Sequence, residues 1–385
     1  MAISPEPHRQ PSLRRIPALD GLRGIAIVLV LFHHLFVYEP TGPAGARVAV
    51  VAEFASHGVD LFFVLSGFLI ARQLAALGSM PGFAARFWLH RAAKIVPLYL
   101  LVVFCVFVPL KGLLAFSGHI EKLGWLLPAR QNWPWYVFFA SNVRNAIDAR
   151  FTNPALDVCW SLGIEVQFYI LAFALARFVA PRQWPRIALA CTFAAVAFRV
   201  GELRLGANWL QVLVLTPGRL DAFSIGAIAA LAPSWLARLP AFIPYVVLCL
   251  PLFTAWSRMG EAVEIGGYTA VALAAGMFVE RAARSAPGAK PNAVLGGTAL
   301  VFMGRISYSI YLVHLPIRAA MRDMLLPHVR SLSTPGDWIA QAAYTLGTGA
   351  TCIALGWLTW KYIEEPARRA VIALGTRAPS TVGST

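Results

Sequence analysis

Long apolar stretches separated by short basic segments run through almost the whole chain. Because a bilayer core about 30 Å thick needs roughly 20 apolar residues per helix, about ten stretches qualify as membrane-spanning helices, within a range of about nine to eleven. The expected spans are 18–38, 60–77, 93–114, 159–179, 186–200, 219–232, 241–256, 265–280, 295–316 and 340–362, with 133–139 as a further short segment. The pattern predicts an all-α polytopic membrane protein.

Composition supports a membrane protein and changes how the charge is interpreted. Of the 385 residues, 58% are hydrophobic and 13% are charged, whereas soluble domains carry about 25% charged residues. A net charge of +15 would suggest nucleic-acid binding in a soluble chain, but the 33 Lys and Arg mostly lie between apolar stretches, as in the loops of polytopic membrane proteins. We therefore expect membrane lipid around the protein and exclude nucleic acid as a partner.

An even number of spans places both termini on one side of the membrane, and the basic N-terminal segment indicates which side. Slightly more Lys and Arg fall on the side of Arg9, Arg14 and Arg15, which predicts cytoplasmic termini. We expect a short basic segment (1–15), one membrane domain (16–369) and a short disordered tail (370–385). The five cysteines lie singly in apolar surroundings, as small buried side chains do, and no metal site is predicted.

The first span carries charges that are costly to place in lipid and are therefore candidates for function. Arg23 and His34 are 11 residues apart, so they point in directions that differ by only about 20° and lie about 16 Å apart along a helix. His33 points about 100° away. A neutral imidazole in such a groove can act as a general base. The alternative is that His34 only hydrogen-bonds a neighbouring helix while Arg23 reaches the interface.

Three other spans contribute candidates for the same site. Glu165 lies at a depth similar to that of His34 and could orient the imidazole, as the carboxylate of a catalytic dyad does; the alternative is a pair with a membrane arginine. Asp60 could orient the donor, although helix capping is the safer interpretation. Arg91 and Lys94 share a helix face and could hold phosphates. Positive-inside topology and anionic lipid contact explain the same two residues equally well.

Further candidates have stronger structural explanations. Ser66-Gly67 among large apolar residues predicts close helix packing rather than a nucleophile. Arg305, expected near mid-membrane, requires an acidic or carbonyl partner. His314 could be catalytic, but we expect an interfacial histidine that hydrogen-bonds a neighbour.

Seven stretches occur together in a recognisable order: LDGLRGIAIVLVLFHH, VDLFFVLSGFLI, RFWLHRAAKIVPLYLL, WSLGIEVQFYIL, RLDAFSIGAIAAL, GRISYSIYLVHLPI and YIEEP. On these motifs, from about Ile16 to Arg369, the chain resembles acyltransferase family 3, the integral-membrane acyltransferases that modify bacterial cell-surface glycans and some small molecules. The family's Arg/Lys–ten residues–His hallmark matches Arg23 and His34. The chain departs from the family at Val166, where a second Glu is usual, and in its basic run, where the usual Arg-Arg followed by another Arg reads His90, Arg91 and Lys94.

The resemblance implies an acyltransferase transferring groups other than amino-acyl groups, in the bacterial inner membrane, with acyl-CoA, usually acetyl-CoA, as donor from the cytoplasm. Arg23, Arg91 and Lys94 would hold the CoA phosphates. His34, oriented by Glu165, would deprotonate the acceptor hydroxyl. An acyl-His34 intermediate is the alternative chemistry. Buried donors that could stabilise the oxyanion are Ser161 and Tyr308.

The acceptor implied by the resemblance is a cell-surface polysaccharide, such as lipopolysaccharide, or a lipid-linked sugar. A small-molecule sugar of the antibiotic type is the nearest alternative. A transporter or translocase of lipid-linked sugar would also bury charges. That class more often shows repeated halves, and no internal repeat is evident in this sequence.

Overall fold

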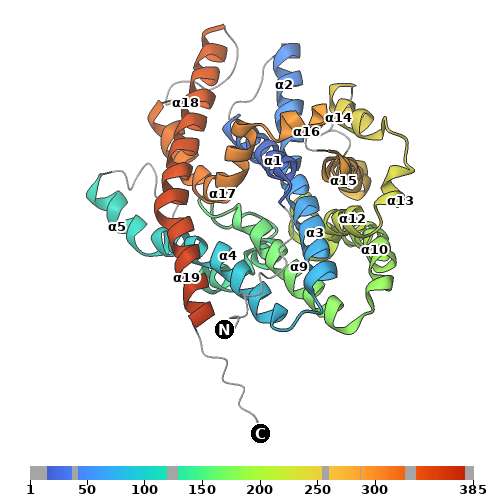
Figure 1. Cartoon of the computed structure of the whole chain (residues 1–385). Helices are drawn as coiled ribbons and strands as arrows, with labels where there is room; N and C mark the ends of the chain where they lie inside the picture. Colours follow the sequence, from blue (N-terminus) through green and yellow to red (C-terminus); the bar gives the residue numbers. More distant parts are fainter. Residues whose placement is uncertain are drawn as a thin grey trace.

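The computed structural model describes residues 15–36, 42–118, 129–253, 260–286, 288–325 and 335–377, and these residues form helices and connecting segments without a β-strand (Figure 1). The α-helices are α1 (Pro17–Leu35), α2 (Gly42–Phe54), α3 (Gly58–Leu77), α4 (Phe83–Phe107), α5 (Pro109–Phe116), α7 (Trp133–Val137), α8 (Ser141–Asp148), α9 (Cys159–Phe178), α10 (Trp184–Arg204), α11 (Trp209–Val214), α12 (Leu220–Leu231), α13 (Pro233–Ala237), α14 (Ile243–Phe253), α15 (Tyr268–Arg284), α16 (Lys290–Leu295), α17 (Thr298–Leu325), α18 (Pro335–Thr359) and α19 (Glu365–Arg377).

The all-α prediction is confirmed for the described residues, and each predicted span overlaps helical structure, although the expected span 93–114 is divided at Val108 between α4 and α5. Six of the described helical segments are long and apolar enough to cross a membrane: Pro17–Leu35, Arg47–Leu77, Phe83–Phe107, Cys159–Phe178, Val263–Arg284 and Thr298–Arg322. Among the others, α12 and α14 have only 12 and 11 residues. A polytopic membrane protein is thus supported, while the larger number of spans and the side on which the termini lie stay predictions.

The C-terminal boundary of ordered structure differs from the prediction. Helix α19 follows α18 along one side of the molecule (Figure 1) and continues to Arg377, so the expected disordered tail from 370 is wrong for its first eight positions. α19 packs against α4, and this contact explains why the segment is helical. Residues 378–385 and most of the predicted basic segment, 1–14, lie outside the described residues.

Glycines allow the two helix crossings that place the site. α3 packs on α12 and α1 packs on α17. A Cβ on Gly67 would lie 2.0 Å from the carbonyl oxygen of Phe223, and one on Gly304 would lie 1.9 Å from that of Asp20. Both distances are far inside van der Waals contact, so only glycine permits this approach of the backbones. The packing function predicted for Ser66-Gly67 is confirmed at Gly67.

Candidate active site

Two cavities lie next to each other between α1, α3, α9 and α17. The larger, here called the His34 cavity, has a volume of about 780 Å³. The smaller, here called the Arg23 cavity, has a volume of about 70 Å³. Val59 and Tyr311 line both and therefore form the partition between them. Charged and histidine side chains lining the larger cavity include His33, His34, His57, Asp60, Asp157, Arg219, Arg318 and Arg322.

His34 lies in the last turn of α1, and its partners define which nitrogen is free. Its Nδ1 is 2.9 Å from the carbonyl oxygen of Val30 and 3.3 Å from Nε2 of His314. Nδ1 of His314 is 2.8 Å from the carbonyl oxygen of Tyr311. Because carbonyl oxygens only accept, the Nδ1 atom of each neutral ring carries the proton. His314 then accepts through Nε2, and Nε2 of His34 retains the lone pair that a general base needs.

Glu165 does not lie beside His34, and the predicted dyad between them is therefore wrong. Its Oε1 accepts hydrogen bonds from the hydroxyls of Ser66, at 2.6 Å, and Tyr169. Glu165 lines the Arg23 cavity, on the other side of the partition from His34. Equal depth in two helices does not determine the direction in which their side chains point. In the structure, the Glu165 side chain points from α9 toward Ser66 on α3. Two rings contact that of His34 instead: His314, for which we expected a structural hydrogen bond, with ring centres 4.9 Å apart, and the preceding His33, with ring centres 4.8 Å apart.

The basic candidates gather around the Arg23 cavity. Arg23 and Lys94 line it together with Glu165. Arg91 lies behind it: its guanidinium donates to Gln73 at 2.8 Å and stands 5.2 Å from the centre of the Tyr169 ring. Three cations on α1 and α4 thus lie near Glu165, and Lys94 also lies near a second carboxylate, Glu364. Arg23 and His34, which share a face of α1, open onto different cavities.

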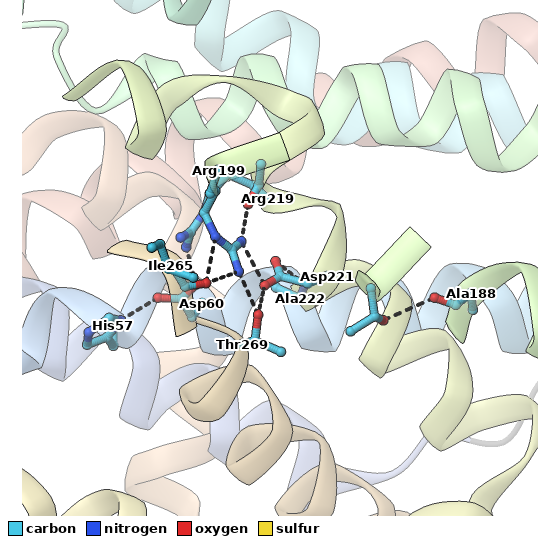
Figure 2. A network of polar contacts seen from close by, with 11 residues as sticks. His57, Asp60, Ala188, Arg199, Arg219, Asp221, Ala222, Ile265 and Thr269 are labelled. Atoms are coloured by element: carbon cyan, nitrogen blue, oxygen red, sulfur yellow. Dashed lines mark hydrogen bonds and ion pairs between the residues drawn. The ribbon is translucent and has the colours of Figure 1, made fainter. Parts of the chain in front are cut away.

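Asp60 is a buried ion-pair partner and not a helix cap. The N-cap residue of α3 is His57, and Asp60 lies three residues further along, in the first turn of the helix. Its Oδ2 is 2.6 Å from Nδ1 of His57, and its Oδ1 pairs with the guanidinium of Arg219 (Figure 2). The Arg219 guanidinium also stacks 4.0 Å from the centre of the Tyr268 ring. These contacts fix one wall of the His34 cavity.

A second buried ion pair supports this wall, and the sequence did not reveal it. Arg199 of α10 pairs with Asp221 at 2.9 Å, so the neighbouring Arg219 and Asp221 take different partners (Figure 2). Arg199 also donates to the carbonyl of Ile265 at 2.8 Å. Ile265 lies in a π-helical turn (Val263–Gly267), where the helical hydrogen-bond pattern shifts. A buried ion pair requires additional hydrogen bonds of this kind to its remaining polar atoms.

The remaining candidates fall into two groups. Ser161 and Tyr308 line the Arg23 cavity, but the Tyr308 hydroxyl donates to the carbonyl of Ile95 at 2.7 Å. Ser161 shares a 2.6 Å hydrogen bond with the hydroxyl of Tyr311 in the partition.

Arg305 is exposed on the outside of α17, and the expected interior partner is wrong. Its neighbour Gly304 faces α1, so Arg305, about 100° further around the helix, points away.

Among the described residues, no group of three or more His, Cys, Asp or Glu side chains could hold a metal ion.

Asp157, in the segment before α9, accepts a hydrogen bond from the backbone amide of Asn153 at 3.1 Å. Burial nevertheless raises the pKa of Asp157 to about 7. This carboxyl therefore changes charge near neutral pH.

Comparison with known proteins identifies relatives over most of the chain. Residues 16–360 match the acyltransferase domain of acyltransferase family 3. The chain is 28% identical over 391 residues to the peptidoglycan O-acetyltransferase OatA of Listeria monocytogenes, covering 93% of this chain and 56% of that protein. It is 25% identical over 382 residues to the O-acetyltransferase OatA of Staphylococcus aureus, covering 93% and 58%. The chain thus spans little more than half the length of these relatives. No solved structure matches it.

Proposed function

Because the chain belongs to acyltransferase family 3, we propose that it is a membrane O-acyltransferase that transfers an acetyl group from acetyl-CoA to a hydroxyl of a bacterial cell-surface glycan. Both relatives described above are O-acetyltransferases by name, and one is named for peptidoglycan. A cell-wall glycan is therefore the favoured acceptor, in place of the lipopolysaccharide considered from sequence. The bacterial inner membrane is the proposed location.

The donor is proposed to enter from the Arg23 side. Arg23 and Lys94 offer charge-assisted hydrogen bonds to phosphate oxygens. A volume of about 70 Å³ accommodates the acetyl thioester end of the donor and not the nucleotide. The nucleotide would therefore lie beyond this cavity, toward the N-terminal half of α4, where Arg91 is located. With the N-terminus in the cytoplasm, this is the cytoplasmic side.

The acceptor is proposed to occupy the His34 cavity. Its volume of about 780 Å³ falls within the range of about 300–1,000 Å³ typical of ligand pockets. Aromatic side chains at its wall, Trp160 and Trp209, provide flat apolar surfaces for sugar rings. Donor and acceptor would then meet at the partition formed by Val59 and Tyr311.

The tautomer of His34 supports direct transfer. Nε2 of His34 takes the proton of the acceptor hydroxyl while its oxygen attacks the thioester carbonyl. A C–O bond forms, the C–S bond breaks, and the CoA thiolate receives the proton from His34. The imidazolium formed in between is stabilised because its Nδ1–H points to Val30 and His314, the function that a carboxylate performs in a catalytic triad. The single observation that carries the proposal is this His34–His314 contact inside a cavity.

The test compares His34 with a histidine in the same local geometry. Nδ1 of His90 lies 2.8 Å from the carbonyl oxygen four residues earlier, as that of His34 does, but His90 is exposed on α4. Wild type, His34→Ala and His90→Ala would be reconstituted in nanodiscs. Release of CoA from acetyl-CoA would be followed with and without a peptidoglycan fragment. We expect fragment-stimulated release from wild type and His90→Ala only. Equal release from all three would refute the function assigned to His34.

A further inference from the structure

One face of α17 forms a polar row that leads away from His34. Tyr311, His314, Arg318 and Arg322 all line or adjoin the site, and Arg318 and Arg322 line the His34 cavity. Spacings of three and four residues place these side chains on one side of a helix. Arg318 lies one turn beyond His314, about 6 Å further along the helix axis. The row therefore extends along α17 from His314, which contacts His34, to the part of the His34 cavity that Arg318 and Arg322 line.

Arg318 differs from the buried Arg199 and Arg219 because, among the described residues, no carboxylate pairs with its guanidinium. The guanidinium groups of Arg199 and Arg219 pair with Asp221 and Asp60. Across the described segments, no ion pair involves Arg318, and its buried Nε atom has no hydrogen-bond partner. The phenol of Tyr344 donates to the backbone carbonyl of Arg318 at 3.1 Å and also lies beside the Arg318 guanidinium, so the polar neighbour of this cation is a hydroxyl and not a carboxylate. An uncompensated cation in a largely buried position is costly.

The acidic side chains of the cavity belong to other walls. Glu53 lies near the end of α2, Glu264 lies in the π-helical turn before α15, and Asp157 precedes α9. Asp60 is occupied by His57 and Arg219. The cavity is therefore polarised: its carboxylates and the paired Arg219 lie on these walls, and its other two arginines, Arg318 and Arg322, lie on the α17 face.

We propose that Arg318 binds an oxyanion carried by the acceptor, so that the preferred acceptor is an acidic sugar and not a neutral one. This inference rests on the proposed function, since it assigns the substrate class of the same cavity. The oxyanion would satisfy the guanidinium through charge-assisted hydrogen bonds. The step of about 6 Å from His314 to Arg318 corresponds to the scale of one sugar ring. The reacting hydroxyl and the anionic group would thus lie on the same or adjacent sugars.

Binding of three matched sugars tests the proposal without any acyl transfer. Glucose 6-phosphate, glucuronate and glucose would be titrated into wild-type protein in nanodiscs by calorimetry, with no acetyl-CoA present. We expect the better of the two anionic sugars to bind at least about tenfold more tightly than glucose, because hydrogen bonds to charged groups are strong. Preference for the phosphate or for the carboxylate then distinguishes a phosphorylated acceptor from a uronic acid.

Variants assign the effect to Arg318. Arg318→Gln should abolish the anionic preference, and Arg318→Lys should retain part of it because charge remains while the fork geometry is lost. Arg305→Gln on the exposed side of α17 is the matched control and should retain it fully. Equal binding of all three sugars by wild type would overturn the proposal, as would an unchanged preference in folded Arg318→Gln. Either result would leave CoA release by wild type unaffected, so failure here is distinguishable from failure of the proposed function.

Discussion

Replacing His314 by alanine removes one of two acceptors for the Nδ1–H of His34. The carbonyl of Val30, at 2.9 Å, remains and still favours the same tautomer. The loss is therefore that of one hydrogen bond, about 0.5–1.5 kcal/mol. At about 1.4 kcal/mol per factor of ten, kcat should fall about 2- to 12-fold. His34→Ala removes the base itself and should cost roughly 10²- to 10⁴-fold.

The assay is steady-state release of CoA with saturating acceptor, measured for wild type, His314→Ala, His314→Gln and His34→Ala. KM for acetyl-CoA should be unchanged in His314→Ala, because the proposed donor site lies across the partition. His314→Gln should recover most of the rate, since its amide oxygen can accept from the Nδ1–H of His34. A His314→Ala defect as large as that of His34→Ala would refute a positioning function and assign chemistry to His314 itself. No defect at all would refute a contribution of the His34–His314 hydrogen bond to the rate.

Three further predictions follow from the contacts described. Lys94→Ala should raise KM for acetyl-CoA about tenfold without changing KM for the acceptor, and an equal rise in both would contradict the division into two cavities. Gly67→Ala should destabilise the protein by about 1–3 kcal/mol in thermal unfolding, because the added Cβ meets the Phe223 carbonyl; Gly112→Ala, where the Cβ meets open space, should be neutral. The pKa of Asp157 is raised from 3.8 to about 7, so the native state binds this proton more tightly than the unfolded chain and stability should fall as pH rises from about 4 to about 7. Asp157→Asn should flatten that fall, and an identical pH dependence of Tm in both proteins would show that the carboxyl is not buried as described.

The helices were predictable because hydrophobic length is a local property of the sequence. Every expected span overlaps at least one helix, including the short segment 133–139, which contains α7. Boundaries moved where packing or a neighbouring turn extends a helix: the last expected span, 340–362, corresponds to α18 from Pro335 to Thr359 followed by a π-helical turn. The number of helices that cross the bilayer depends on tertiary placement, which apolar length alone does not determine.

The chemistry of the site was only partly predictable, for a geometric reason. Helical periodicity placed Arg23 and His34 on one face of a helix, and in the structure both residues lie in the continuous helix α1. Which side chain meets His34 depends on the rotation of other helices, and depth alone made Glu165 a better candidate than His314. A signal did exist: His314 lies near the outer end of its expected span, as His34 does. Arg199 gave no such signal, because its partner is supplied by a contact between distant segments.

The central claim is that donor and acceptor reach His34 from opposite ends of α1, and proteoliposomes test it most directly. Protein of one orientation would be reconstituted with a peptidoglycan fragment sealed inside the vesicles, and labelled acetyl-CoA would be added outside. With the Arg23 side facing outward, the account predicts labelled acetyl ester on the enclosed fragment for wild type and none for His34→Ala. Transfer only when donor and acceptor share one compartment, or labelling that persists in His34→Ala, would contradict it.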